Sequence, residues 1–439
     1  MHSLSHLSCY MKLSRKNMAN AISILSKYLP PLYLAAILFG QVFLSSIANI
    51  LNVENRAVML ILRFLIMVLS YGYILSHFRR RKAYYLRSPW IVCLVTFWII
   101  YSFRLFFDQY VSGVALALPA WELFAWSLGS SLPIAICSFL FAAKNRLLSI
   151  LFGQAKHGVF LLGFSIVCFL VNPGTIQGAF YLEHLNAITC ANAGCALFLL
   201  CLGNILLPKS SCDNLPPPLF IEWAGMAVGL FIVVYSATRG VLISTFLITV
   251  ASIFFFRQSL QILESFQRKN FVLLVPVFFG VIFVATHSPL LLEKLFTSRA
   301  PESILTRLEF WRVSAEQFTI NPLLGTGFGL QELLGSLEIE KGIYYPHNYL
   351  LESLAVGGIV MTLPLIYCTL FPLVNFHKRA KSDASVFPLW LLGVQALVYS
   401  MHNGHLGDFP FFWMIFGCMA GTKYRLNNSV NSELSNAND

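Results

Sequence analysis

The sequence predicts an all-α integral membrane protein with about twelve transmembrane helices. Three observations lead to this fold class. First, 57% of the 439 residues are hydrophobic and only 11% are charged, which is too apolar for a soluble globular protein. Second, apolar runs that are each about long enough to cross a bilayer core of ~30 Å recur along nearly the whole chain. Third, basic residues gather in alternate connections between these runs, as they do on the cytoplasmic side of membranes.

The apolar runs divide the chain into five predicted regions. Residues 1–28 form a cytoplasmic tail, 29–287 contain spans 1–9, 288–347 form an outer loop, 348–422 contain spans 10–12, and 423–439 form a second cytoplasmic tail. The predicted spans are 29–49, 57–76, 89–107, 119–142, 157–172, 186–206, 218–237, 240–256, 270–287, 348–374, 386–403 and 409–422.

The distribution of Lys and Arg predicts that both termini are cytoplasmic. With the N-terminus inside, most of the 30 basic residues fall in inner connections, for example in the run Arg79–Lys82. The short outer connections contain only Arg56, Arg104 and Arg239. The net charge of +11 is explained by this bias towards an anionic leaflet, so it does not indicate nucleic-acid binding.

The connection between spans 9 and 10 is far longer than the other outer connections. Loops of this length in compact proteins are usually functional or disordered. This one contains a helical pattern, "PESILTRLEFWRVSAEQF", with Pro301 suited to the first turn. The following "NPLLGTGFG" predicts a tight turn that returns the chain to the membrane surface. No predicted strand precedes these glycines and no Lys-Ser/Thr follows them, which argues against a nucleotide site, although their N–H groups suit an anion.

Arg239, in "VVYSATRGVLIS", lies between two apolar runs at the predicted outer boundary. An ionisable group at such a place is costly without an anionic partner or water, so it is a functional candidate. The alternative is a side chain that snorkels to the interface. Gly240 beside it allows a close backbone approach.

The loop helix supplies further cations. Arg307 and Trp311 are four residues apart on one helix face, so a guanidinium and an indole can be presented together to a polar lipid headgroup. Arg312 and Arg299 lie close by in the sequence. Alternatively, the arginines pair with glutamates of the same helix, which contributes little to stability on a solvated surface.

His347 and Asn348, in "YYPHNYLLES", return to the membrane surface just before span 10. One interpretation is an interfacial cap for the helix. The other follows from the topology, which brings Arg239, Arg307 and His347 to the same outer interface. Two guanidiniums suit a pyrophosphate, because their planar forks bind its oxygens in pairs. A neutral imidazole suits the removal of a proton from a hydroxyl group.

These segments resemble the O-antigen ligase and O-antigen polymerase superfamily of bacterial inner membranes. The resemblance is carried, in order, by "SATRGVLIS", "TRLEFWRVSAEQFTINPLLGTGFG" and "PHNYLLESLAVGGIVM", within residues 235–361. It implies a multi-pass inner-membrane enzyme whose active site faces the periplasm. It further implies that Arg239 and Arg307 hold the pyrophosphate of an undecaprenyl-linked glycan, while His347 activates or aligns the acceptor hydroxyl, with inversion and without a metal ion or another cofactor.

Several acceptors fit this resemblance. A ligase uses a sugar of the lipid A core, a polymerase uses another lipid-linked repeat unit, and a related oligosaccharyltransferase uses a protein Ser or Thr. The single dominant loop and the absence of an appended soluble domain favour the ligase. A transporter of lipids or glycans is the competing class, but such proteins usually show internal repeats, broken helices and a site near the bilayer midplane.

Two further places have weaker signals. Arg63, in span 2 near its outer end, is a candidate contact for a lipid phosphate. His402, His405 and Asp408, in "MHNGHLGDFPFFW", lie near the outer turn between the last two spans. Their spacing is compatible with a divalent ion, with polar support of the same cavity, or with a plain interfacial turn.

Overall fold

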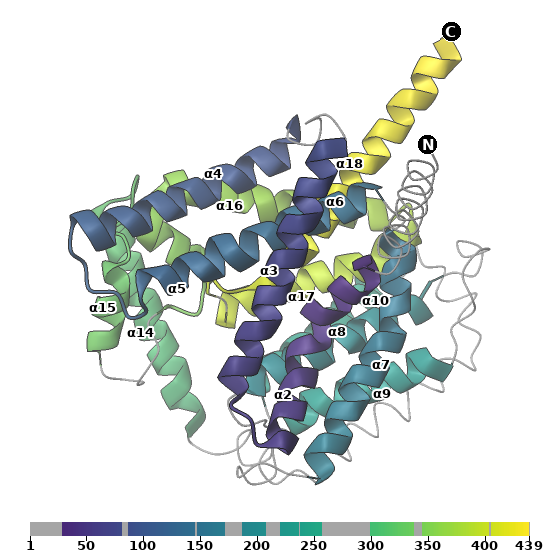
Figure 1. The fold of residues 1–439 in the computed structure, drawn as a ribbon, viewed down its shortest axis with the longest axis horizontal. Helices are drawn as coiled ribbons and strands as arrows, with labels where there is room; N and C mark the ends of the chain where they lie inside the picture. Colours follow the sequence, from purple (N-terminus) through teal and green to yellow (C-terminus); the bar gives the residue numbers. More distant parts are fainter. Residues whose placement is uncertain are drawn as a thin grey trace, which may run out of the picture.

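The computed structural model describes residues 29–80, 87–144, 147–171, 187–207, 220–236, 238–256, 299–337, 345–403 and 405–438. Within these ranges the regular elements are all helices, which form a bundle of side-by-side rods (Figure 1). Helices occupy the predicted span ranges except 270–287, which lies outside the described residues.

The first half of the chain forms helices that correspond to the early predicted spans. They are Leu29–Leu51, which includes η1 (Ala36–Gly40) and α2 (Gln41–Leu51), then α3 (Asn55–Arg80), α4 (Pro89–Phe106) with η3 (Phe107–Val111), α5 (Ala120–Phe124), η4 (Ala125–Ser131), α6 (Leu132–Lys144), α7 (Leu147–Val171) and α8 (Ala187–Ile205).

The second half contains the candidate motifs. Its helices are α9 (Phe220–Tyr235), α10 (Arg239–Phe256), α14 (Arg299–Ile320), α15 (Gly329–Ser336), α16 (Tyr349–Ala380), η6 (Ala384–Val386), α17 (Phe387–Asn403) and α18 (Pro410–Asn438). The predicted loop helix is therefore present as α14. Helix α18 continues beyond the predicted end of span 12 at residue 422, so residues 423–438 extend that helix.

The helices support an all-α membrane protein. Among the described residues, seven helices are long and apolar enough to cross a membrane. The apolar helices Phe220–Tyr235 and Arg239–Ser252 are shorter. A multi-pass membrane fold is thus supported, while the total of twelve spans and their orientation stay predictions.

Small residues bring some of these helices into close contact. Helix α18 packs on α6, where Gly417 and Gly421, four residues apart, face the carbonyl oxygens of Ala135 and Phe139. A Cβ atom at either glycine would collide with those carbonyls, so the close approach requires glycine. Aromatic side chains fill the adjoining core, including Trp98 against Trp413 with ring centroids 5.2 Å apart.

Helix α16 is broken at Gly358, which has a φ of 61°. The turn after α14 docks on this break. The N–H groups of Ile359 and Val360 donate to the carbonyl oxygens of Pro322 and Leu323, at 2.9 and 3.2 Å. In return, the N–H group of Thr326 donates to the Ala355 carbonyl at 2.8 Å. Protein groups therefore satisfy the interrupted backbone, as they must when a helix is broken within a membrane.

The glycine-rich turn is also fixed from its other side. Gly325 and Gly327 have φ values of 67° and 89°, which glycine adopts without strain. The N–H group of Phe328 donates to a carboxylate oxygen of Asp108 at 2.6 Å, and Arg104 pairs with that carboxylate at 3.0 Å. The turn does bind an anion, as its glycines suggested, but the anion is the protein's own Asp108.

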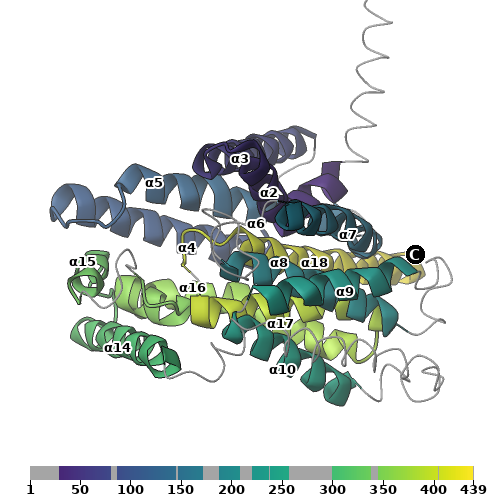
Figure 2. The same cartoon turned by 90° about the horizontal axis from the view of Figure 1, so that it is seen from below.

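The turn and its flanking helices lie at one end of the bundle. Both views place α14 and α15 beside α16 at the end opposite to the C-terminal end of α18 (Figures 1 and 2). Helix α14 packs directly on α16. The sequence predicts this same separation between the loop and the C-terminus.

Candidate active site

Arg239 is the first residue of α10, and its half-buried side chain makes no hydrogen bond or ion pair with a described residue. Gly240 faces the imidazole of His402 on α17. A Cβ atom at Gly240 would lie 3.3 Å from Cδ2 and 3.4 Å from Nε2 of that ring. The glycine therefore brings the start of α10 directly against His402.

Arg307 lies on α14. Its side chain is half-buried and, within the part of the chain that the structure describes, forms no hydrogen bond or ion pair. Its charge opposes the rise in the pKa of Tyr345 that burial causes. The two cations that the sequence singled out thus come from separate helices, α10 and α14.

Trp311, one turn after Arg307, fixes the segment that carries His347. Its indole N–H donates to the carbonyl oxygen of Pro346 at 2.9 Å. This bond ties the loop helix to the residues just before α16. The indole N–H is consequently already used within the protein, while a contact between the ring and a lipid headgroup stays a prediction.

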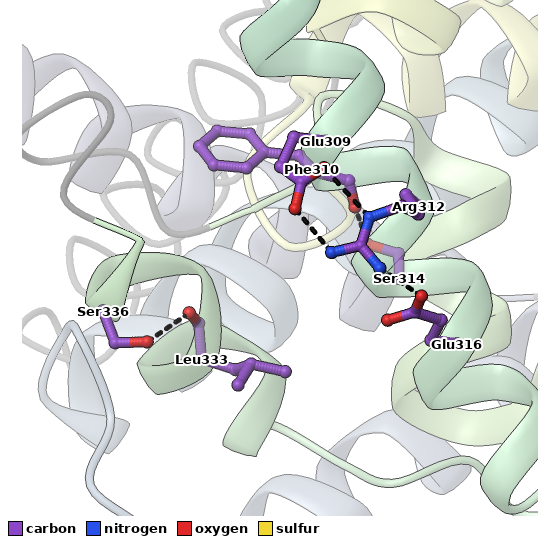
Figure 3. Close-up of polar contacts among 7 residues, drawn as sticks. All are labelled: Glu309, Phe310, Arg312, Ser314, Glu316, Leu333 and Ser336. Atoms are coloured by element: carbon purple, nitrogen blue, oxygen red, sulfur yellow. Dashed lines mark hydrogen bonds and ion pairs between the residues drawn. The ribbon is translucent and has the colours of Figure 1, made fainter.

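Arg312 differs from Arg307 because two glutamates of its own helix neutralise it. It pairs with Glu309 at 2.6 Å and also with Glu316 (Figure 3). Its side chain is 55% exposed. The hydrogen bond from Arg312 lowers the pKa of Glu309. This is the solvated-helix alternative described above. Arg299 begins α14, and its role stays a prediction.

His347 is buried at 7% exposure and has a φ of 54°, a left-handed conformation that is uncommon for a residue other than glycine. Residues held in such conformations often cluster at functional sites. The next residue, Asn348, caps α16, because its Oδ1 atom accepts hydrogen bonds from the N–H groups of Leu350 and Leu351, both at 3.1 Å. The capping interpretation therefore applies to Asn348, whereas His347 is held beside the cap.

Tyr345 lies between two histidines. Its ring centroid is 4.6 Å from that of His347 and 5.0 Å from that of His405. Burial raises the pKa of Tyr345 above its ordinary value, and the nearby Tyr399 adds to the rise. The phenol therefore stays protonated at neutral pH.

Glu352, in the first turn of α16, is almost fully buried and holds the opposite turn in place. Its carboxylate lies 3.4 Å from Nε2 of His405 and accepts a hydrogen bond from the Leu406 N–H group at 3.1 Å. The N–H group of Gly407 donates to Nδ1 of His405 at 3.2 Å. Both nitrogens of His405 are thus used inside the protein. We did not single out Glu352 from the sequence, although an acid within an apolar run is a signal.

The positive charge of Arg63 is paired within the protein. It pairs with Asp408 at 3.1 Å, and its guanidinium lies 3.6 Å from the ring centroid of Trp126. Arg63, Asp408 and Tyr399 line a cavity of about 140 Å³ between the helices. The three residues of the predicted outer turn therefore have separate partners, with His402 at Gly240 and the Val398 carbonyl oxygen, His405 at Glu352 and Asp408 at Arg63.

The comparison with protein families agrees with this geometry. Residues 224–366 match the family model described as O-antigen ligase. No curated protein matches the chain. The match confirms the predicted relationship to the O-antigen ligase and polymerase superfamily, and it covers Arg239, Arg307 and His347. It indicates a membrane enzyme of the glycosyltransferase kind with lipid-linked glycan substrates.

Proposed function

Starting from this relationship, we propose that the protein is an O-antigen ligase of the bacterial inner membrane, with its active site facing the periplasm. The proposed donor is a glycan linked to undecaprenyl pyrophosphate. The proposed acceptor is a sugar of the lipid A core. The family match supports the general class, and the choice of donor and acceptor is our proposal.

One observation carries the proposal. Arg239 begins α10 and Arg307 lies on α14, both side chains are half-buried, and neither has a carboxylate partner among the described residues. Leaving a half-buried guanidinium without a counterion is costly unless an anion binds there. Because each guanidinium can bind two phosphate oxygens, the pair suits a pyrophosphate.

The chemistry follows from the charges. The acceptor hydroxyl oxygen attacks the anomeric carbon as the bond from that carbon to the pyrophosphate oxygen breaks, and the configuration inverts. Negative charge grows on the departing pyrophosphate, where Arg239 and Arg307 stabilise it. The resemblance implies that His347 activates or aligns the acceptor hydroxyl. The step needs no cofactor, since the guanidiniums supply the positive charge.

The break in α16 bears on the competing transporter interpretation. Broken helices in transporters often expose backbone groups that bind the substrate. In this protein, the N–H groups of Ile359 and Val360 bind carbonyl oxygens of the docked turn. The break therefore supports a fixed loop structure and gives no support to a midplane substrate site.

A lipopolysaccharide gel tests the proposal. The strains are a host that lacks the gene, and the same host carrying wild type, Arg239→Ala or the control Arg379→Ala, which removes a cation from the far end of α16. Lipid-linked glycans are extracted in parallel. Core without O-units together with accumulated lipid-linked polymer identifies a ligase, if wild type and the control restore attachment and Arg239→Ala does not.

Other outcomes of the same experiment contradict the ligase proposal. Core bearing single units in the deletion strain indicates a polymerase. An unchanged profile in the deletion strain favours transport or protein glycosylation. Full rescue by well-expressed Arg239→Ala shows that the two-arginine site is wrong.

A further inference from the structure

A second cavity lies at the start of α4, away from the candidate site. It has a volume of about 170 Å³ and forms where the start of α4 meets the second half of α16 and α18. The other end of α4 carries Arg104, which pairs with Asp108 at the glycine-rich turn. In the predicted topology, the start of span 3 and the ends of spans 10 and 12 face the cytoplasm, so the cavity lies on the predicted inner side. Its lining includes Ser88, Trp90, Tyr367, Phe371, Lys423 and Tyr424.

Ser88 precedes α4, but its side chain does not cap the helix. Serine is a favoured N-cap residue, because its hydroxyl oxygen accepts from a free N–H group of the first turn. The Ser88 hydroxyl forms no such bond, nor any hydrogen bond with another described residue, although the residue is only 5% exposed. A buried hydroxyl group without a partner is costly. Because Ser88 lines the cavity, a ligand bound there would satisfy its hydroxyl group.

The start of α4 leaves further donors free. Its first residue, Pro89, has no N–H group, and the N–H group of Val92 donates to the Ser88 carbonyl oxygen at 3.1 Å. The N–H groups of Trp90 and Ile91 therefore come before the hydrogen bonds of the helix, and neither has an acceptor among the described residues. Free N–H groups and the helix dipole both favour negative charge at such an end.

Lys423 adds a full positive charge from α18. Its ammonium nitrogen lies 4.0 Å from the ring centroid of Phe371, and it forms no ion pair with a carboxylate of the described chain. None of the described residues that line the cavity is acidic. Phe371 is 42% exposed, and its neighbours Leu370 and Val374 are exposed as well. The cavity therefore joins a positive, hydroxyl-bearing end to an apolar face of α16.

We propose that this cavity binds the phosphate group of an anionic phospholipid of the cytoplasmic leaflet, such as phosphatidylglycerol. Lys423 and the start of α4 compensate the negative charge, and the Ser88 hydroxyl donates to a phosphate oxygen. The acyl chains lie on the apolar face of α16, which a free phosphate has no group to cover. The site is separate from Arg239, Arg307 and His347, so the inference does not depend on the proposed ligase activity.

Thermal unfolding of the purified full-length protein in detergent tests the site, because a ligand that binds the folded state raises Tm. Phosphatidylglycerol, phosphatidylcholine and inorganic phosphate are added in separate titrations. We expect half-maximal stabilisation at about fivefold less phosphatidylglycerol than phosphatidylcholine, the scale of one Lys at an anionic surface. Inorganic phosphate should not raise Tm at the same concentrations.

Variants of the two polar residues separate charge from phosphate binding. Lys423→Gln should remove the preference for phosphatidylglycerol, whereas Lys423→Arg should keep it. Ser88→Ala should weaken the binding of both phospholipids about fivefold, because both contain the phosphate that the hydroxyl group binds. The matched control is Lys381→Gln, since this exposed lysine lies just after α16 and outside the cavity. It should leave the preference unchanged.

Several outcomes overturn the inference. Equal affinity of the wild type for the two phospholipids excludes an anionic-lipid site, as does an unchanged preference in Lys423→Gln. Stabilisation by inorganic phosphate that equals that by phosphatidylglycerol shows a free-anion site instead. Equal losses in Lys381→Gln and Lys423→Gln show that general surface charge, rather than this cavity, attracts the lipid. The Tm of each variant without lipid shows whether it is folded, and no step of the test uses glycan transfer.

Discussion

The two faces of helix α14 carry the same residue type in opposite settings. Arg312, on the outer face, is more than half exposed and is paired with Glu309 and Glu316. Arg307, five residues earlier, is half-buried and has neither partner. Two glutamates of the helix thus neutralise Arg312, which water already stabilises. The half-buried Arg307 has no carboxylate partner among the described residues. This difference teaches that burial without a counterion, rather than the mere presence of a cation, distinguishes the arginine that we propose to bind the substrate.

The strongest test of this comparison is the pair of variants Arg307→Ala and Arg312→Ala. Loss of Arg307 should lower kcat by about 100-fold or more, the usual cost of removing one group that stabilises developing charge. Loss of Arg312 should change kcat less than about twofold, because exposed ion pairs contribute little. The assay is glycan transfer by the purified full-length protein in lipid nanodiscs, with an undecaprenyl-pyrophosphate-linked glycan and lipid A core. Equal losses in this transfer assay would contradict the distinction between the faces.

Arg307→Lys sharpens the comparison by keeping the charge and removing the planar fork. Lysine cannot bind two phosphate oxygens side by side, so we expect kcat to fall by about tenfold, between wild type and Arg307→Ala. The transfer assay with saturating donor measures it. Wild-type activity in Arg307→Lys would mean that charge alone is sufficient there.

Trp311→Phe tests the face of α14 that also carries Arg307, without changing a charged residue. The variant keeps an aromatic ring but loses the hydrogen bond to Pro346, worth about 1 kcal/mol. Thermal unfolding in detergent should show a small decrease in stability, and transfer should weaken because the His347 segment loosens. The exposed Trp121 supplies the control, since Trp121→Phe should change neither. An unchanged Trp311→Phe variant would show that this bond does not position the segment.

The smallest effect is expected from Glu309→Gln on the outer face. Because Arg312 lowers the pKa of Glu309, any stabilisation by the pair exists at neutral pH and disappears as the pH falls through that lowered pKa. The wild type and Glu309→Gln should therefore unfold at nearly the same temperature at pH 7, and any difference should shrink on acidification. A difference that grows at low pH would contradict the ion pair.

The membrane helices were predictable because long apolar runs have few alternatives in a bilayer. The predicted loop helix and the tight turn were also found, because a helical stripe and glycines are local signals. The partners of the turn were not predictable. Asp108 is 220 positions away from Phe328, and no local pattern links them.

The candidate site shows the same division. Arg239 and Arg307 stood out because isolated cations in apolar surroundings are unusual. The pairing of Arg312 with its own helix was left as an alternative, and the structure favours it. The placement of His402 at Gly240 depends on how α10 and α17 pack, so the sequence showed only that a histidine lay near the outer turn.

The docked turn at Gly358 has a consequence for biogenesis. The N–H groups of Ile359 and Val360 bind the carbonyl oxygens of Pro322 and Leu323, which precede them in the chain and are synthesised first. The same docking positions α14, with Arg307, beside α16. The break in the membrane helix and the placement of α14 therefore depend on the same contacts, so a change in the turn should disturb both.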